Sequence, residues 1–291
     1  PVIMLSSLTT EGAAVTMQCL ELGASDFLTK PGGAGLSDLS STATRLAELL
    51  ISYGGTYAKK KGRVVTPPRR IANLYPALEK KPVVEKGVAP SAQEQKPESP
   101  TSYIVNTFNT VFSTARQKKE PSIVTPLREP GKIEIIAIGI STGGPNALRV
   151  FRKIDPNLKQ PILVVQHMPA GFTEEFANSL NTICPLEVKE AKDGDLIKSG
   201  RILIAPGNYH IYVERRSLAA VVRLSDAPQR NGHRPSADVL FESVASVYQN
   251  RALGVIMTGM GSDGAAQLAE MRRQGAHTLG QNEESCIVYG M

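Results

Sequence analysis

Cysteines are few in this sequence and long apolar runs are missing, and each absence excludes a class of protein. The three cysteines, Cys19, Cys184 and Cys286, are scattered and odd in number, which argues against a disulfide framework or a zinc site and for a reducing compartment. No apolar run reaches the roughly 18 residues that a membrane-spanning helix needs, and the first residues lack the basic and then apolar pattern of a signal peptide. We therefore expect a cytoplasmic protein with no membrane insertion.

An excess of one charge sign is confined to the middle of the chain. The net charge is +6, but residues 1–53 have two basic and five acidic side chains, and residues 133–291 have 16 of each. The excess therefore lies in residues 54–132, with 15 basic and six acidic side chains. A fold that binds nucleic acid gathers basic residues on a folded face, so we expect no nucleic-acid partner. The basic segment is interpreted as a solvated linker, although it could still touch acidic partners.

The first 53 residues predict a small α/β unit. Apolar runs predict strands over 1–6 and 25–29, and amphipathic stretches predict helices over 11–22 and 37–53. A piece of ~50 residues is marginal as a free-standing fold, so we expect the C-terminal part of a domain whose front is missing. Residues 54–132 hold 10 of the 20 prolines and few periodic apolar stretches, which predicts a long linker.

From residue 133 strands alternate with helices, which predicts a doubly wound, mostly parallel sheet. Strands are expected over 133–140, 162–166, 186–188, 252–258 and 276–279, and helices over 146–154, 173–180, 236–249 and 265–274. Thr173 is expected to cap the second of these helices. Three stretches alternate apolar and polar residues and are predicted to be antiparallel additions to the sheet: 201–205, 209–214 and 218–224.

A buried strand and a sharp turn meet at Ser141. The apolar run before it ends at Gly143-Gly144-Pro145, where a helix is expected to begin. The Ser141 hydroxyl could act as a nucleophile or cap this helix, and the free amides of the helix start could hold a phosphate or an oxyanion. The glycine spacing matches neither the dinucleotide fingerprint nor the P-loop, which weakens the phosphate alternative.

Two further polar residues follow apolar strands in the same way. His167 comes after 162–166 and Asp263 after 252–258, and the carboxyl ends of parallel strands meet at one sheet edge. With Ser141 they are the parts of a hydrolytic triad, in which histidine takes the serine proton and aspartate orients the histidine. Taken singly, His167 could be a structural histidine and Asp263 a turn residue or helix cap. The remaining histidines are rival bases: His210, His233 and His277.

Five motifs in the last part of the chain resemble those of the chemotaxis protein-glutamate methylesterase family, CheB. They are Gly-Ile-Ser-Thr-Gly-Gly-Pro-Asn-Ala-Leu, Val-Val-Gln-His-Met-Pro, Ala-Pro-Gly-Asn-Tyr-His, His-Arg-Pro-Ser-Ala-Asp-Val-Leu-Phe and Met-Thr-Gly-Met-Gly-Ser-Asp-Gly. The resemblance implies that Ser141 is the nucleophile, His167 the base and Asp263 the orienting carboxylate. It also implies an oxyanion hole formed by the backbone amides of Thr142 and Met260, with no cofactor and no metal.

The same resemblance implies a reaction and a substrate. The substrates are γ-glutamyl methyl esters on the cytoplasmic helices of methyl-accepting chemoreceptors, which are hydrolysed with release of methanol during receptor adaptation. Many members of the family also deamidate receptor glutamines. The catalytic domain is expected to span 133–291, and because the family's last motif runs on beyond Met291, we expect its C-terminal end to be missing.

The first part of the chain resembles the last third of a response-regulator receiver domain. The matching stretches are Val-Ile-Met-Leu-Ser-Ser and Gly-Ala-Ser-Asp-Phe-Leu-Thr-Lys-Pro. Ser6 and Lys30 then match the switch hydroxyl and the lysine that contacts the phosphorylated aspartate. That aspartate would lie before Pro1, so the chain as it stands is not expected to be phosphorylated. For the full-length protein the resemblance implies a chemotaxis histidine kinase as partner and a receiver that covers the active site until it is phosphorylated.

Overall fold

The computed structural model describes residues 1–30, 36–63 and 124–291. Most of the expected linker lies outside these residues. Within the described residues, no helix is both long and apolar enough to cross a membrane.

The N-terminal residues form two parallel strands and two helices, as expected. Strand β1 (Ile3–Ser6) pairs with β2 (Asp26–Thr29), so that Ser6 lies opposite Thr29. Helix α1 (Thr10–Glu21) begins after Thr9, whose hydroxyl accepts a hydrogen bond from the Gly12 amide at 3.0 Å. Helix α2 (Leu36–Lys60) runs seven residues past its expected end at 53, because two consecutive glycines do not interrupt it.

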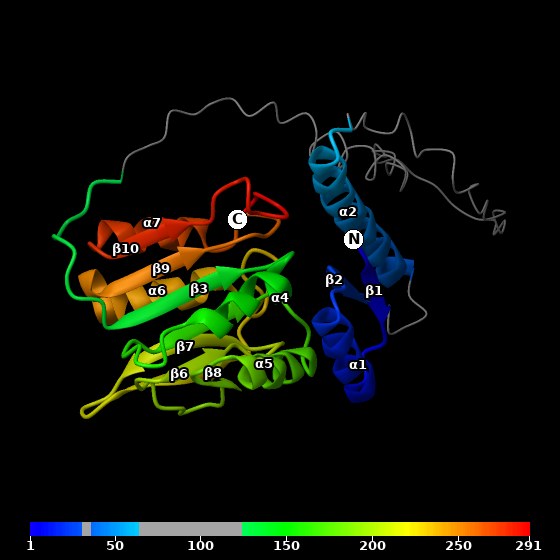
Figure 1. Ribbon diagram of the computed structural model, residues 1–291. Coiled ribbons are helices and arrows are strands. Elements are labelled where there is room, and N and C mark those ends of the chain that lie inside the picture. Colours follow the sequence, from blue (N-terminus) through cyan, green and yellow to red (C-terminus); the bar gives the residue numbers. More distant parts are fainter. Residues whose placement is uncertain (31–35, 64–123) are drawn as a thin grey trace, which may run out of the picture. The chain divides into compact units, whose positions relative to one another are not determined.

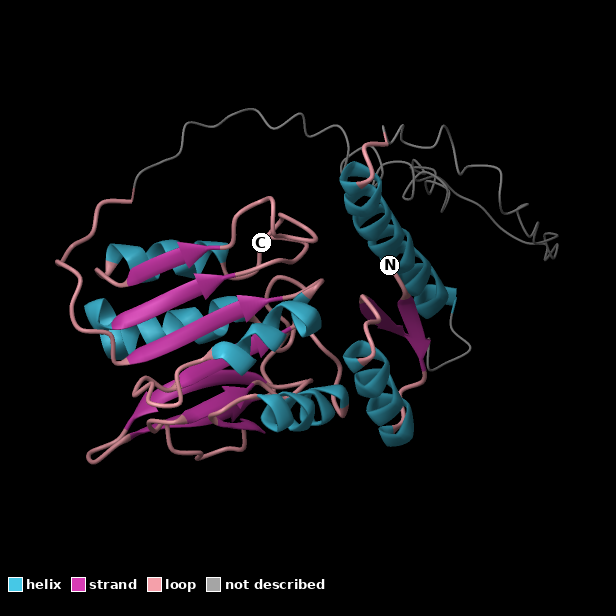
Figure 2. Ribbon diagram, in the orientation of Figure 1, coloured by secondary structure: helices cyan, strands magenta, loops and turns pink. Residues whose placement is uncertain are grey.

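A six-stranded parallel sheet forms the centre of the remaining chain (Figures 1 and 2). Its strands are β3 (Ile135–Ile140), β4 (Ile162–Gln166), β5 (Glu187–Glu190), β6 (Arg201–Ile204), β9 (Ala252–Ile256) and β10 (His277–Gly280). They lie in the order β10-β9-β3-β4-β6-β5, and every neighbouring pair is parallel. The doubly wound, mostly parallel fold class is therefore confirmed. The antiparallel placement of 201–205 was wrong, because β6 is buried between β4 and β5 as a parallel strand.

The antiparallel part of the fold is a separate hairpin. Strands β7 (His210–Arg215) and β8 (Ala220–Ser225) pair with each other in a two-stranded sheet of their own. The hairpin itself was expected, but not its separation from the main sheet. Ile211 and Val222 are fully buried in the core on one face of the main sheet, so the hairpin packs as a covering layer and does not extend the sheet.

Alternate strand residues serve two different cores. Ile135 and Ala137 of β3 face a core shared with the hairpin, α6 (Ala237–Tyr248) and α7 (Ala265–Arg273). Ile138 and Ile140 face the opposite core, shared with α5 (Phe172–Ile183), the α4 segment (Gly144–Ala147) with its 3-10 continuation (Leu148–Lys153), and α1. Both faces are covered, which explains why these strands read as continuous apolar runs.

Thr173 does not cap α5 as expected. The residue before the helix is Gly171, and no side chain caps this helix end. The Thr173 hydroxyl instead donates to Glu190 Oε1 and accepts from the Gly207 amide at 3.0 Å. Tertiary partners therefore outcompete the local cap.

Part of the expected linker contacts the catalytic part of the chain. The amide of Leu127 donates to the Arg273 carbonyl at 2.7 Å, and the amide of Gly131 donates to Asn250 at 2.9 Å. The chain thus enters β3 along the amino-terminal edge of the sheet.

The strand order reverses beside the central strand. The chain leaves β3 toward β4, and it leaves β9 toward β10 on the other side. Such a reversal opens a crevice at the carboxyl ends of the strands, where ligands bind in open α/β sheets.

Candidate active site

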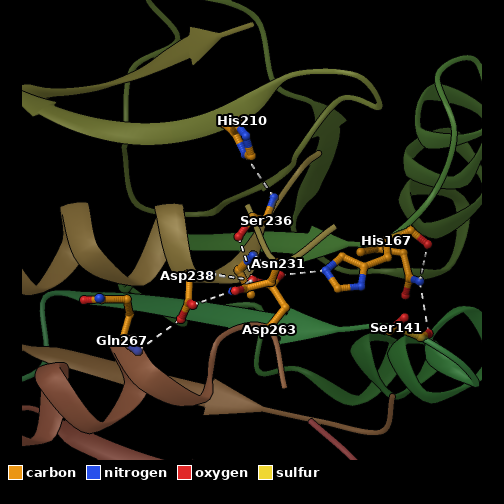
Figure 3. Close-up of polar contacts among 10 residues, drawn as sticks. Ser141, His167, His210, Asn231, Ser236, Asp238, Asp263 and Gln267 are labelled. Carbon is orange, nitrogen blue, oxygen red and sulfur yellow. Dashed lines mark hydrogen bonds and ion pairs between the residues drawn. The ribbon is translucent and has the colours of Figure 1, made fainter. Parts of the chain in front are cut away.

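The loops after β3, β4 and β9 bring the three predicted residues to this edge of the sheet (Figure 3). Ser141 and His167 directly follow β3 and β4, and both line a cavity of about 120 Å³. Ser141 is 3% exposed and Asp263 is 1% exposed. A cavity of this small volume is suited to one side chain of a larger substrate and not to a free nucleotide.

The clearest interaction joins His167 to Asp263. His167 Nε2 lies 2.8 Å from Asp263 Oδ2, and both side chains are almost fully buried. The other ring nitrogen, Nδ1, is buried without a hydrogen-bond partner among the described residues. Because Asp263 holds Nε2, Nδ1 is the nitrogen left to accept a proton.

Asp263 is held from several sides (Figure 3). The Ser236 hydroxyl donates to its Oδ1 at 2.6 Å, the Asn231 amide donates to the same atom at 2.9 Å, and the Ala237 backbone amide donates to Oδ2 at 2.6 Å. Ala237 begins α6, so the positive end of that helix also faces the carboxylate. Burial alone would raise the pKa of Asp263, but these hydrogen bonds and the one from His167 hold its pKa well below the ordinary value.

A second layer supports these donors. Asn231 also donates to Asp238 Oδ2 at 2.6 Å, and Asp238 Oδ1 accepts from the Gln267 amide at 3.0 Å. The Ser236 amide donates to His210 Nδ1 at 3.2 Å. The sequence did not predict a role in the site for three of these residues: Ser236, Asn231 and Asp238. An Asn-Gly turn signal at Asn231 and a serine ahead of α6 were the available signs.

The rival histidines occupy other roles. His210 is engaged at both ring nitrogens, because Nε2 lies 3.1 Å from the Pro228 carbonyl while Nδ1 accepts from Ser236. His277 is exposed on β10. His233 stacks on His167 with ring centroids 3.7 Å apart. Among the four histidines, the hydrogen bond to Asp263 belongs to His167.

The turn that carries Ser141 is fixed through its backbone. The Ser141 amide donates to the Thr258 carbonyl at 3.0 Å, and its carbonyl accepts from Gly144 and from Gln166 Nε2. Gly143 has φ 82°, a conformation that favours glycine. A Cβ on Gly144 would lie 1.8 Å from Gln166 Oε1, so only glycine fits there as well.

The hydroxyl of Ser141 is free by contrast. In the part of the chain that the structure describes, no hydrogen bond joins Ser141 Oγ to His167 or to any other residue. The backbone amides of Thr142 and Met260, the predicted oxyanion hole, likewise donate no hydrogen bond to a described residue. Free donors beside a free hydroxyl can stabilise an oxygen that becomes negative when the serine attacks a carbonyl.

Residues of the N-terminal part also touch the Ser141 turn. Asp26 Oδ2 accepts from the Gly143 amide at 3.0 Å, and burial raises the pKa of Asp26. Arg45 Nη2 donates to the Thr142 hydroxyl at 2.6 Å, and its Nη1 lies 3.8 Å from Met260 Sδ. A carboxylate already occupies the amide that a phosphate would need, which weakens the phosphate alternative further.

The predicted receiver residues lie away from this cavity. Ser6 ends β1, and its hydroxyl donates to the Gly12 carbonyl at 3.0 Å. The Lys30 amide donates to the Ser6 carbonyl at 2.6 Å, so the two residues sit at adjacent strand ends. Neither lines the Ser141 cavity. No group of three or more metal-ligating side chains occurs among the residues that were placed.

Comparison with known proteins identifies the family. The CheB methylesterase family model matches residues 136–291, which is more than half of the chain. The chain belongs to the CheB methylesterase family. A protein of Treponema pallidum, named protein-glutamate methylesterase/protein-glutamine glutaminase, is 51% identical over 100% of this chain and 72% of its own length.

Two further relatives agree with this family assignment. A Halalkalibacterium halodurans protein of the same name is 38% identical over 100% of this chain and 69% of its own length. The crystal structure of the Thermotoga maritima CheB methylesterase catalytic domain superposes with a TM-score of 0.54 at 36% identity, covering 55% of this chain and 86% of that one. The described strands and helices after residue 133 therefore have the family's catalytic fold.

Proposed function

We propose that this chain is a serine hydrolase that cleaves γ-glutamyl methyl esters on chemoreceptors and deamidates receptor glutamines. The observation that carries the proposal is the buried His167–Asp263 pair, which lies beside the free hydroxyl of Ser141 within the family-matched residues. The relatives' names give the two reactions.

In the first step Ser141 Oγ attacks the ester carbonyl. His167 Nδ1 takes the serine proton, and Asp263, hydrogen-bonded at Nε2, stabilises the imidazolium that forms. The tetrahedral intermediate then collapses, the C–O bond to the methoxy group breaks, and Nδ1 returns the proton to the leaving oxygen. Methanol departs and an acyl-enzyme remains. With a glutamine substrate the C–N bond breaks and ammonia leaves.

The oxyanion is stabilised by the amides of Thr142 and Met260. Neither amide donates a hydrogen bond to a described residue. The backbone beside Met260 is held by the neighbouring Gly259 amide, which donates to the Val288 carbonyl at 3.0 Å. Loss of one such donor typically costs about 10²–10³ in rate. In the second step water attacks the acyl-enzyme with His167 Nδ1 as base, releasing glutamate and restoring the serine.

The division of the chain and its partners belong to the same proposal. Catalysis is assigned to residues 133–291, residues 1–53 to a receiver remnant with Ser6 and Lys30, and the segment between them to a linker. The substrate is the cytoplasmic helical region of methyl-accepting chemoreceptors, which places the protein in the cytoplasm. A chemotaxis histidine kinase is the partner of the full-length protein.

Methanol release from methylated receptor tests the proposal. Ser141→Ala is expected to lower the rate by about 10⁴-fold or more, because removing a triad nucleophile leaves only the contribution of binding and the oxyanion hole. Ser243→Ala is the matched control, because Ser243 lies in α6 and, among the described residues, its hydroxyl bonds only to Val213 and Leu240. Near-normal methanol release by the folded Ser141→Ala protein would overturn the assignment.

A further inference from the structure

A tight turn from Arg230 to His233 reaches the triad from outside the strand-end loops. The amides and carbonyls of these two residues exchange hydrogen bonds of 3.1 and 3.0 Å. Asn231 and Gly232 between them have φ 54° and 77°. A two-residue turn with both φ positive, made of Asn-Gly, is the most favoured hairpin turn. Arg230 pairs with Glu242 of α6, so the turn is preformed and anchored.

The turn delivers two side chains to two different members of the triad. Asn231 donates to Asp263 Oδ1 at 2.9 Å. The His233 ring lies flat on the His167 ring, with centroids 3.7 Å apart and planes inclined by 11°. Stacking covers a face of the His167 imidazole and leaves both nitrogens at the ring edge free to hydrogen-bond.

We propose that His233 is a positioning residue that holds the His167 ring by stacking, so that Nε2 stays on Asp263 and Nδ1 faces the serine. This inference rests on the proposed function. An imidazole tethered at a single nitrogen can still rock about that hydrogen bond, and small displacements of a reacting group cost large factors in rate. The stacked ring limits this motion without using either nitrogen of His167.

The surroundings of His233 suit this role better than acid–base chemistry. Neither ring nitrogen of His233 hydrogen-bonds to Ser141 or Asp263 in the described structure. Burial is the main cause that lowers the pKa of His233 to about 4, and the neighbouring His167 and Arg45 lower it further, against the opposing effect of Asp263. His233 is therefore neutral near pH 7 and does not repel the imidazolium that forms on His167.

Two substitutions at His233 separate stacking from other roles. His233→Phe keeps a flat ring and is expected to retain kcat for methanol release within about threefold. His233→Ala removes the ring and is expected to lower kcat by about 10- to 100-fold with KM little changed. His277→Ala, at an exposed position on β10, is the control and should match the unsubstituted protein.

Other outcomes overturn the inference. An unchanged kcat in His233→Ala, or an equally large loss in His233→Phe and His233→Ala, would show that the ring does not act by stacking. A loss confined to the yield of folded protein, with normal kcat per folded molecule, would reduce His233 to a structural role.

The pH dependence of stability tests the buried stack without any activity. The pKa of His233 falls from 6.5 to about 4 on folding, so between these pH values the unfolded chain binds a proton that the folded chain does not. Stability is therefore lost as the pH is lowered from 6.5 toward 4. His233→Phe should lose less stability over this window in thermal unfolding. Equal losses would contradict the stack, whereas failure of the proposed function alone would leave this difference intact.

Discussion

The carboxylate end and the hydroxyl end of the site are built in opposite ways. Asp263 accepts hydrogen bonds from Ser236, Asn231, the Ala237 amide and His167. The Ser141 hydroxyl makes none with the described residues, although its backbone is held on both sides. The Asp263 carboxylate, which orients the base, is thus held in place by the fold. The nucleophilic oxygen of Ser141 makes no such hydrogen bond.

This difference separates two requirements of the site, namely a fixed orientation of the base and free hydrogen-bond donors for the substrate. A buried carboxylate needs hydrogen-bond partners, because an unpaired charge in the interior destabilises the protein. Leaving the Ser141 hydroxyl and the Thr142 amide unpaired costs little, because both residues line a cavity, and it reserves their hydrogen bonds for the substrate. Fixed orientation on one side and free donors on the other are what preorganised acyl transfer requires.

Asp263→Asn acts on the carboxylate end and should have the largest effect on the rate. An amide that donates to Nε2 forces the imidazole proton onto Nδ1, the nitrogen that must accept from Ser141, so methanol release should fall by about 10⁴-fold. Asp238→Asn is the control, because the Asp238 side chain accepts from Asn231 and Gln267, and Asp238 meets Asp263 through a backbone amide that the substitution keeps. Its rate should stay within about tenfold. A rate for Asp263→Asn within tenfold of the unsubstituted protein would mean that Asp263 does not set the tautomer.

Ser236→Ala removes one neutral donor from Asp263 and should have a smaller effect. The remaining donors keep the carboxylate ionised, so a roughly tenfold loss of kcat is expected, equivalent to about 1.4 kcal/mol. Ser243→Ala removes the same group from the interior of α6, and Ser243 does not contact the triad in the described structure. Equal kcat losses in the two variants would indicate a general effect on the helix and not on Asp263.

Arg45→Ala tests the hydroxyl end and should have the smallest effect. The guanidinium contacts the side chains of Thr142 and Met260, the two residues whose backbone amides form the predicted oxyanion hole, so we expect it to hinder entry of the substrate. Its removal is expected to raise kcat/KM severalfold, and Lys61→Ala, beyond the end of α2, should have no effect. A fall in kcat/KM for Arg45→Ala would mean that the cation assists the reaction.

Much of the arrangement was predictable from buried strands and the residues that follow them. The apolar runs before Ser141 and His167 and the run before Asp263 placed three polar residues at one edge of a parallel sheet, because parallel strands align their carboxyl ends. The position of β6 was not predictable in this way. A short run buried on both faces carries no sign of its direction.

The supporting residues depend on contacts between distant segments. Ser236 sits just before α6, where a serine usually caps its own helix, yet its hydroxyl turns to Asp263, 27 positions along the chain. The choice between Nε2 and Nδ1 of His167 is likewise set by the position of Asp263. Sequence patterns give the identity of such residues but not the direction in which their side chains point. The Asn231–Gly232 pair is the exception, since its turn could have been predicted.

The central claim is that Asp263 holds Nε2 of His167 and leaves Nδ1 as the base. Nitrogen-15 NMR of the histidine-labelled chain measures this directly, because the chemical shifts distinguish a protonated from an unprotonated ring nitrogen. The chain has four histidines, so a His167→Gln sample assigns the His167 signals by difference. For the neutral imidazole we predict that Nε2 carries the proton and Nδ1 does not. A proton on Nδ1 with a bare Nε2 would contradict the account.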